Sequence, residues 1–155
     1  MTQSAFESLL GEIAATIADR PLDSALQTFL NAEYPADGEV VARIAALCVE
    51  GEAEGWVCGR EAGGIAFGRV IKPGGAAGRF SVDVVRMADI VGPHHRHPKG
   101  EIDLILPLEG APAFDGVRAG WCVYPPGSAH HPTVTGGSAH VLYLLPEGEI
   151  AFTGA

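Results

Sequence analysis

The sequence predicts a mainly β protein, α+β by the count of its elements, in which helices precede a β-sandwich or closed β-barrel. Two observations predict this class. The spacing of apolar residues changes near residue 54 from a helical to a strand period, and Gly and Pro, 21 and 11 of the 155 residues, concentrate after residue 60. A chain of this length suits one domain. We therefore expect residues 1–53 to pack on a barrel formed by residues 54–155.

Three apolar stripes at helical spacing indicate helices between residues 4 and 50. Ser4 and Glu7 form a possible capping box at the start of the first helix. Pro21 and Pro35 separate the stripes, and Gly51 is expected to end the third. The stripe residues, which we expect to face the core, are Phe6, Leu9, Leu10, Ile13, Ile17, Leu22, Ala25, Leu26, Phe29, Leu30, Val40, Val41, Ile44, Leu47 and Cys48.

The remainder of the chain alternates short apolar runs with turn residues. Runs rich in Val, Ile and aromatic residues, separated by Gly and Pro, are typical of sandwiches and barrels. The expected strands lie within Gly55–Cys58, Ile65–Ile71, Phe80–Met87, Glu101–Leu108, Trp121–Tyr124 and Ala139–Leu145.

Charge and cysteine content limit the class of function. The net charge is −9 and the sequence has no cluster of Lys and Arg, so we expect no nucleic-acid partner. The three cysteines include no C-x-x-C pair, which indicates free thiols rather than a disulfide framework. No apolar run reaches the ~18 residues that a membrane span needs, and no signal peptide is recognisable. We expect a cytoplasmic protein without a membrane partner.

The histidines are the clearest functional signal. Residues 92–101 read G-P-H-H-R-H-P-K-G-E, and His95 and His97, two positions apart, would share one face of a strand. Glu101 is separated from them by an even number of positions, so on a regular strand it would lie on the same face. Two imidazoles and a carboxylate on one face can bind a divalent metal and leave positions open for water or substrate. Residues 125–132 read P-P-G-S-A-H-H-P, where a tight turn presents His130 as an available fourth ligand.

These two stretches resemble the two motifs of the cupins. H-R-H-P-K-G-E matches the H-x-H-x3-E part of the first motif, and P-P-G-S-A-H matches the P-x-G-x2-H part of the second. The resemblance implies a cupin-type β-barrel or jelly roll and one divalent transition metal (Fe, Mn, Ni, Co, Cu or Zn) bound by His95, His97, Glu101 and His130. The flanking glycines are shifted from the family pattern and Val134 replaces its usual Asn, which indicates a divergent branch.

Several other residues are candidates for roles around the metal. Asp103 shares the face of Glu101 on a regular strand, and could orient a ligand, act as a catalytic base together with Glu101, or be a solvated acid. Trp121, Tyr124 and Tyr143 could line a pocket for an aromatic substrate, although strand aromatics are more often core. Arg69 and Arg79 are candidates to bind a carboxylate, with Lys72 and Arg96 less suited. His94 and His131 should point away from the metal, and His140 reads as a hydrogen-bonded core or pocket-wall residue.

A narrower resemblance suggests a reaction. Residues 91–107, 120–137 and 141–148 look like a group of small bacterial cupins similar to the 4-hydroxylaminobenzoate lyases, whose members also carry a helical N-terminal segment. This implies a lyase that acts on an aromatic acid and forms 3,4-dihydroxybenzoate and ammonia. Alternatives are a non-haem iron dioxygenase of a catechol or thiol and a non-catalytic ligand-binding cupin. A homodimer is expected because cyclic dimers are the commonest homo-oligomers.

Overall fold

The computed structural model describes residues 2–153, and its first part is helical. The three helices are α1 (Thr2–Ile17), α2 (Ser24–Glu33) and α3 (Glu39–Glu54). Asp23 caps α2, because its side chain accepts a hydrogen bond from Leu26 N at 2.9 Å. The capping box predicted at Ser4 is wrong, because Ser4 lies inside α1, which already begins at Thr2. No helix in residues 2–153 is long and apolar enough to cross a membrane.

Helix α3 runs further than the sequence predicted. It passes through Gly51 and ends at Glu54, with Gly55 in the left-handed conformation (φ 94°). The bonds from Trp56 N to Gly51 O (3.0 Å) and from Gly55 N to Glu52 O (3.2 Å) form a Schellman motif. The strand predicted at Gly55–Cys58 is therefore wrong, because these residues follow the helix as a turn. Gly51 serves packing instead, since a Cβ there would lie 2.5 Å from Val57 Cγ2.

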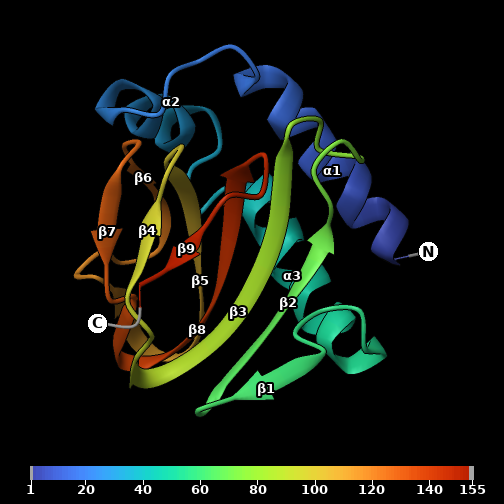
Figure 1. The fold of residues 1–155 in the computed structure, drawn as a ribbon. Helices are drawn as coiled ribbons and strands as arrows, with labels where there is room; N and C mark the ends of the chain where they lie inside the picture. Colours follow the sequence, from blue (N-terminus) through green and yellow to red (C-terminus); the bar gives the residue numbers. More distant parts are fainter. Residues whose placement is uncertain (1, 154–155) are drawn as a thin grey trace.

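Within residues 2–153, nine strands form two antiparallel sheets. The larger sheet has the order β1-β2-β3-β8-β5-β6 and the smaller one the order β7-β4-β9. Figure 1 shows the long strands β3, β5 and β8 in the middle of the molecule. Helices α1 and α3 lie on one side of them, and the smaller sheet of β4, β7 and β9 lies on the other. This arrangement confirms the prediction of a β jelly roll preceded by helices. The strands are β1 (Arg60–Ala62), β2 (Ile65–Ile71), β3 (Phe80–Val91), β4 (His95–His97), β5 (Glu101–Phe114), β6 (Gly120–Tyr124), β7 (Ser128–His130), β8 (Thr133–Pro146) and β9 (Ala151–Phe152).

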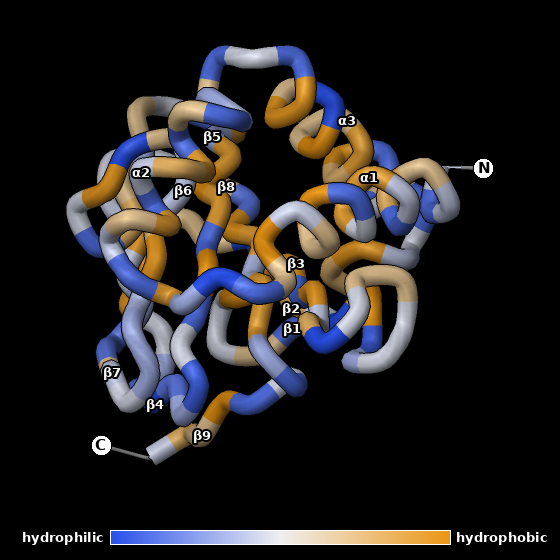
Figure 2. The backbone as a smooth tube through the Cα atoms, turned by 90° about the horizontal axis from the view of Figure 1, so that it is seen from above, coloured by the Kyte–Doolittle hydropathy of each residue, from blue (hydrophilic) through white to orange (hydrophobic). Residues whose placement is uncertain are grey.

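The central strands β5 and β8 of the larger sheet are buried on both faces over most of their paired length. The outer face of this sheet carries Leu104 and Leu142, which pack with the apolar stripes of the helices, whereas its inner face carries Ile105 and Val141. Burial on both faces explains why these strands read as continuous apolar runs rather than as an alternation. Figure 2 shows α1 and α3 together on one side of the strands, and the mostly hydrophilic β4 and β7 on the other.

Polar side chains join the helices to the sheet. From α2, Asn31 donates to Trp121 O (3.0 Å) and accepts from Trp121 N (2.9 Å), so the helix covers the edge strand β6. From α3, Glu52 binds Arg86 Nε through Oε2 and His140 Nε2 through Oε1, both at 2.7 Å. His140 is thus a buried, hydrogen-bonded residue of the helix–sheet interface, as one of the two predicted alternatives had it.

Candidate metal centre and the adjoining hollow

Four potential ligands converge between the two sheets. One nitrogen or oxygen atom of each of His95, His97, Glu101 and His130 lies within 4.8 Å of the others. Glu101 Oε1 is 3.1 Å from His97 Nε2 and 3.4 Å from His95 Nε2, and Glu101 Oε2 is 3.7 Å from His130 Nε2. The first three residues are buried and His130 is nearly so. The structure therefore brings together the set that the two motifs predicted.

Strand pairing explains the convergence. His95 and His97 share one face of β4, as expected, and His95 is paired directly with His130 of β7. Glu101 instead begins β5 in the other sheet. Its even-numbered spacing from the histidines therefore does not explain why its side chain reaches them. The link between the two strands depends on Gly100, whose φ is 90° and where a Cβ would lie 2.8 Å from Tyr124 O.

The hydrogen bond of His97 fixes the position of its ring proton. Ser128 Oγ lies 2.9 Å from His97 Nδ1 and also donates its only proton to Pro125 O at 2.7 Å. The hydroxyl must therefore accept from Nδ1–H of His97. This leaves the lone pair of Nε2 directed at the cluster, as a metal ligand requires.

Asp115 does the same for His130 and was not foreseen from the sequence. Its carboxylate can only accept, so His130 donates from Nδ1 to Oδ2 and keeps a bare Nε2. Asp115 also accepts from Tyr124 Oη (2.6 Å) and Thr133 N (2.9 Å). Burial alone would raise the pKa of Asp115, but the bonds from His130 and Tyr124 outweigh it and hold that pKa below its usual value. The only local signal was an Asp-Gly pair, which reads as a turn.

The cluster has the polar character of a cation site. Both carboxylate oxygens of Glu101 and Nε2 of His97 are buried without a hydrogen-bond partner in residues 2–153. Burial raises the pKa of Glu101, but the facing histidines more than offset this and the pKa lies well below its usual value. A buried carboxylate is costly unless it is paired or binds a metal. Three imidazoles and one carboxylate suit a divalent transition metal, so the residues present fit such an ion.

Asp103 lies next to this cluster on the inner face of β5. It is fully buried, and neither of its oxygens has a hydrogen-bond partner in the described chain. Burial, followed by the negative charge of Glu101, raises the pKa of Asp103 well above its usual value. The reading of Asp103 as a solvated acid is therefore wrong, and two neighbouring carboxyls have pKa values displaced in opposite directions.

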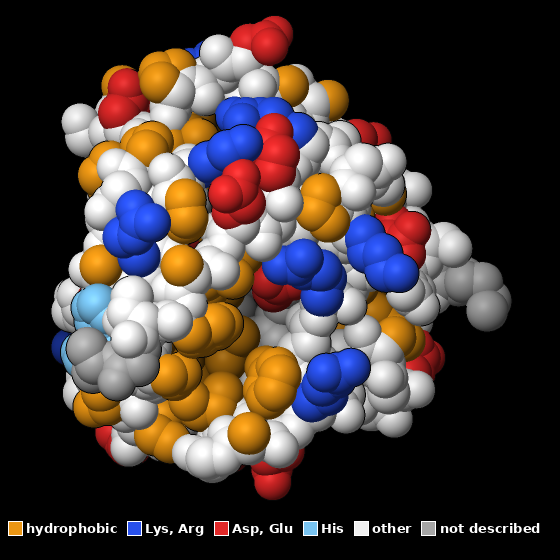
Figure 3. All heavy atoms as spheres, in the orientation of Figure 1, with side chains coloured by type: hydrophobic (Ala, Val, Ile, Leu, Met, Phe, Trp, Pro, Cys, Tyr) orange, Lys and Arg blue, Asp and Glu red, His pale blue; other side chains and the backbone are white. Residues whose placement is uncertain are grey.

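A hollow of about 850 Å³ opens beside the cluster. Apolar side chains of the inner sheet face line it, including Phe67, Val85 and Met87, and His95 forms part of its wall. Figure 3 shows hydrophobic side chains gathered around a hollow in this face, with Lys and Arg at its margin. Its size and apolar lining are those of a small-molecule site.

The candidates for substrate contacts divide into two groups. Arg69 and Tyr143 line the hollow. Arg69 already pairs with Asp83, Nε to Oδ1 at 2.7 Å. Arg79 does not line the hollow: its guanidinium lies over the ring of Phe80, with Nη1 3.8 Å from Glu147 Oε2. Trp121 is on the outer sheet face, where its Nε1 donates to Tyr34 O at 2.9 Å.

The other histidines lie outside the cluster. His94 bonds to the side chain of Thr153, and its ring is 4.8 Å from that of the exposed His131. Both were expected to point away from the metal ligands. Arg96, between two of those ligands, is exposed as its strand parity predicted.

Known proteins resemble this chain over most of its length. The family model PnbB, 4-hydroxylaminobenzoate lyase, matches residues 8–152. The chain belongs to the 4-hydroxylaminobenzoate lyase family. It is 28% identical over 158 residues to a 4-hydroxylaminobenzoate lyase of Pseudomonas putida, covering 91% of this chain and 90% of that protein. It is 30% identical over 145 residues to one of Nocardioides sp. (strain LMS-CY), covering 88% and 86%.

Membership of the 4-hydroxylaminobenzoate lyase family confirms the predicted resemblance and the prediction of a lyase, so the alternative of an oxidoreductase is not needed. Similar solved structures include the DMSP lyase DddQ from Ruegeria pomeroyi, at 20% identity and a TM-score of 0.48, covering 97% of this chain and 96% of that one. An oxalate oxidase in complex with glycolate is 23% identical with a TM-score of 0.45, covering 60% and 57%.

Proposed function

We propose that the protein converts 4-hydroxylaminobenzoate and water into 3,4-dihydroxybenzoate and ammonia. The equation balances without an oxidant: the N–O and C–N bonds of the substrate break, and two ring carbons end with hydroxyl groups. We further propose that His95, His97, Glu101 and His130 hold one divalent metal. The bound ion would supply Lewis-acid chemistry to the oxygen that leaves nitrogen or to the added water.

One observation carries this proposal. Three imidazole nitrogens and a carboxylate converge at the wall of an apolar hollow, and hydrogen bonds to Ser128 and Asp115 orient two of the rings toward the common point. Such a hollow accepts a benzene ring, and the oriented rings are typical of metal ligands rather than of a packed core. The names of the relatives supply the substrate class.

The two neighbouring carboxyls would divide the proton transfers. Burial raises the pKa of Asp103 well above its usual value, so we assign Asp103 the role of donating a proton to the departing oxygen. The facing histidines hold the pKa of Glu101 below its usual value, and we assign Glu101 the role of accepting a proton from the added water. Tyr143 pairs with Asp103 across β5 and β8 and lines the hollow, so we assign it to the substrate's ring. We assign the substrate carboxylate to Arg69.

The test is a turnover assay that measures both products and oxygen. The proposal expects equal amounts of ammonia and 3,4-dihydroxybenzoate from 4-hydroxylaminobenzoate, with no oxygen uptake. Oxygen uptake with a catechol or thiol, together with no ammonia from the hydroxylamine, would instead favour a dioxygenase. Tight binding of the aromatic acid without any product would favour a ligand-binding protein.

A further inference from the structure

A second cluster of metal-ligating side chains lies on the opposite face of the larger sheet. Ligand atoms of Glu52, Cys58 and His140 lie within 4.8 Å of one another. Glu52 and Cys58 come from helix α3 and the turn that follows it, whereas His140 comes from the distant strand β8. None of these residues takes part in the proposed lyase reaction.

We propose that Glu52, Cys58 and His140 form a second metal site, for a thiophilic divalent cation such as Zn²⁺, that ties α3 to the sheet. The set offers one thiolate sulfur, one imidazole nitrogen and one carboxylate oxygen, all of which Zn²⁺ accepts. With three protein ligands, a fourth position remains for water.

The hydrogen bonds around Glu52 are compatible with a metal. Its Oε2 is held by Arg86 Nε at 2.7 Å, which leaves Oε1 to face His140 Nε2, also at 2.7 Å. A cation bound by Oε1 and Nε2 would replace only the second of these contacts. Arg86 would then orient the carboxylate from outside the ligand set, as partners of metal ligands commonly do.

The other two ligands can adjust to an ion. His140 is buried, and its Nδ1 has no hydrogen-bond partner in residues 2–153, so only the Glu52 contact orients the ring. Tetrahedral bonds of about 2.0–2.3 Å need ligand atoms somewhat further apart than the present 2.7 Å, and a small ring movement provides this. The thiol of Cys58 points into the same region, because its Sγ lies within 4.8 Å of the ligand atoms of Glu52 and His140, and it donates a hydrogen bond to Val84 O at 3.4 Å.

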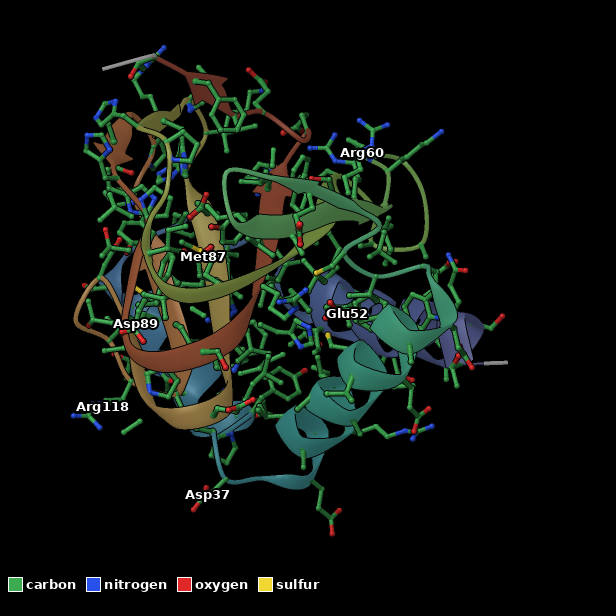
Figure 4. The ribbon with its side chains drawn as sticks, turned by 90° about the horizontal axis from the view of Figure 1, so that it is seen from below. Asp37, Glu52, Arg60, Met87, Asp89 and Arg118 are labelled. Carbon is green, nitrogen blue, oxygen red and sulfur yellow. The ribbon has the colours of Figure 1, made fainter. Side chains whose placement is uncertain are left out.

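A cation can reach the cluster from solvent. The side chain of Glu52 is 25% exposed and Cys58 is partly exposed. Figure 4 shows Glu52 where α3 meets the strands, with sulfur drawn beside it. Burial raises the pKa of Cys58 to about 12, so the ion must displace a proton, which a thiophilic metal does and Mg²⁺ or Ca²⁺ does not.

Cobalt spectroscopy on the full chain tests the proposal. A thiolate-to-Co²⁺ charge-transfer band reports only a site that contains cysteine, whereas the proposed catalytic cluster has none. We expect the band in the wild type, its loss in Cys58→Ser and in His140→Gln, and its retention in Cys122→Ser, the matched control on the inner sheet face. Arg86→Gln should weaken Co²⁺ binding about tenfold while keeping the band.

Two results would overturn the proposal: no charge-transfer band in the wild type with excess Co²⁺, or a band that survives Cys58→Ser. Thermal melting covers a variant that folds poorly, because Zn²⁺ should raise the melting temperature of the wild type and of Cys122→Ser by more than that of Glu52→Gln, in which only the His95, His97, Glu101 and His130 cluster can still bind it. An equal rise in Glu52→Gln would also count against the site. Neither the Co²⁺ band nor the Zn²⁺ melting shift depends on lyase turnover. The second metal site and the lyase reaction can therefore be disproved independently of each other.

Discussion

His130 donates from Nδ1 to Asp115 Oδ2, and this bond joins a metal-facing ring on β7 to the turn that follows β5. The contact fixes the proton on the far side of the ring. Without it, the imidazole could rotate or carry its proton on Nε2, where a metal must bind. The quality of the proposed centre therefore depends on a residue that is not itself a ligand.

Asp115→Asn should weaken metal binding about 10–100-fold, the usual cost of losing such a partner. Competition with a chromophoric chelator measures this directly. Asp37→Asn removes the same charge at an exposed position and is the control. Equal affinities for Asp115→Asn and wild type would show that His130 needs no orienting carboxylate.

Asp103→Asn should lower turnover about 10²-fold or more while the metal content stays unchanged, because an amide cannot supply the acidic proton of a buried carboxyl. Single-turnover rates and metal analysis of the same sample separate the two effects. Turnover at the wild-type rate would remove Asp103 from the mechanism. The same reasoning applies to Glu101→Gln, where unchanged turnover with metal retained would exclude its proton role.

Arg69 is best tested together with its partner, because removing it alone leaves Asp83 unpaired. The double variant Arg69→Gln/Asp83→Asn keeps the charge of the hollow unchanged. We expect KM for 4-hydroxylaminobenzoate to rise about tenfold or more and KM for hydroxylaminobenzene, which lacks the carboxylate, to stay the same. Equal effects on both compounds would mean that Arg69 shapes the hollow without binding the carboxylate.

Gly51→Ala should destabilise the protein by about 1–3 kcal/mol, since the added methyl collides with Val57 and Trp56 at the end of α3. Denaturant unfolding gives the value. Gly59→Ala is the control, because the nearest atom to a Cβ there is 3.6 Å away. Stabilisation of Gly51→Ala, which helix propensity alone would predict, would show that this contact relaxes easily.

The sequence indicated the ligands more securely than their surroundings, for physical reasons. His95, His97 and Glu101 stand in one short motif, so the sequence alone identifies them as a set, even though a turn separates β4, which carries the histidines, from β5, which carries Glu101. Trp121 is one of the predicted pocket residues, but β6 is buried on both faces, where composition does not distinguish inner from outer side chains. The role of Asp115 depends on a contact between the turn after β5 and strand β7, which no local pattern encodes.

Gly51 illustrates the same limit at a helix end. Glycine commonly follows the last helical turn, and the sequence offers both Gly51 and Gly55 for that position. The choice between them depends on Trp56 and Val57 packing against the bare backbone of Gly51, which is a tertiary contact.

The measurement that tests the central claim most directly is elemental analysis of the purified protein beside His95→Ala and His94→Gln. His94→Gln is the control because that histidine lies outside the ligand cluster. The account predicts at least one divalent transition metal per chain in the wild type and in His94→Gln, and one fewer in His95→Ala, with turnover lost in parallel. A wild type that binds no metal after reconstitution, or a His95→Ala variant that keeps its full metal content, would contradict it.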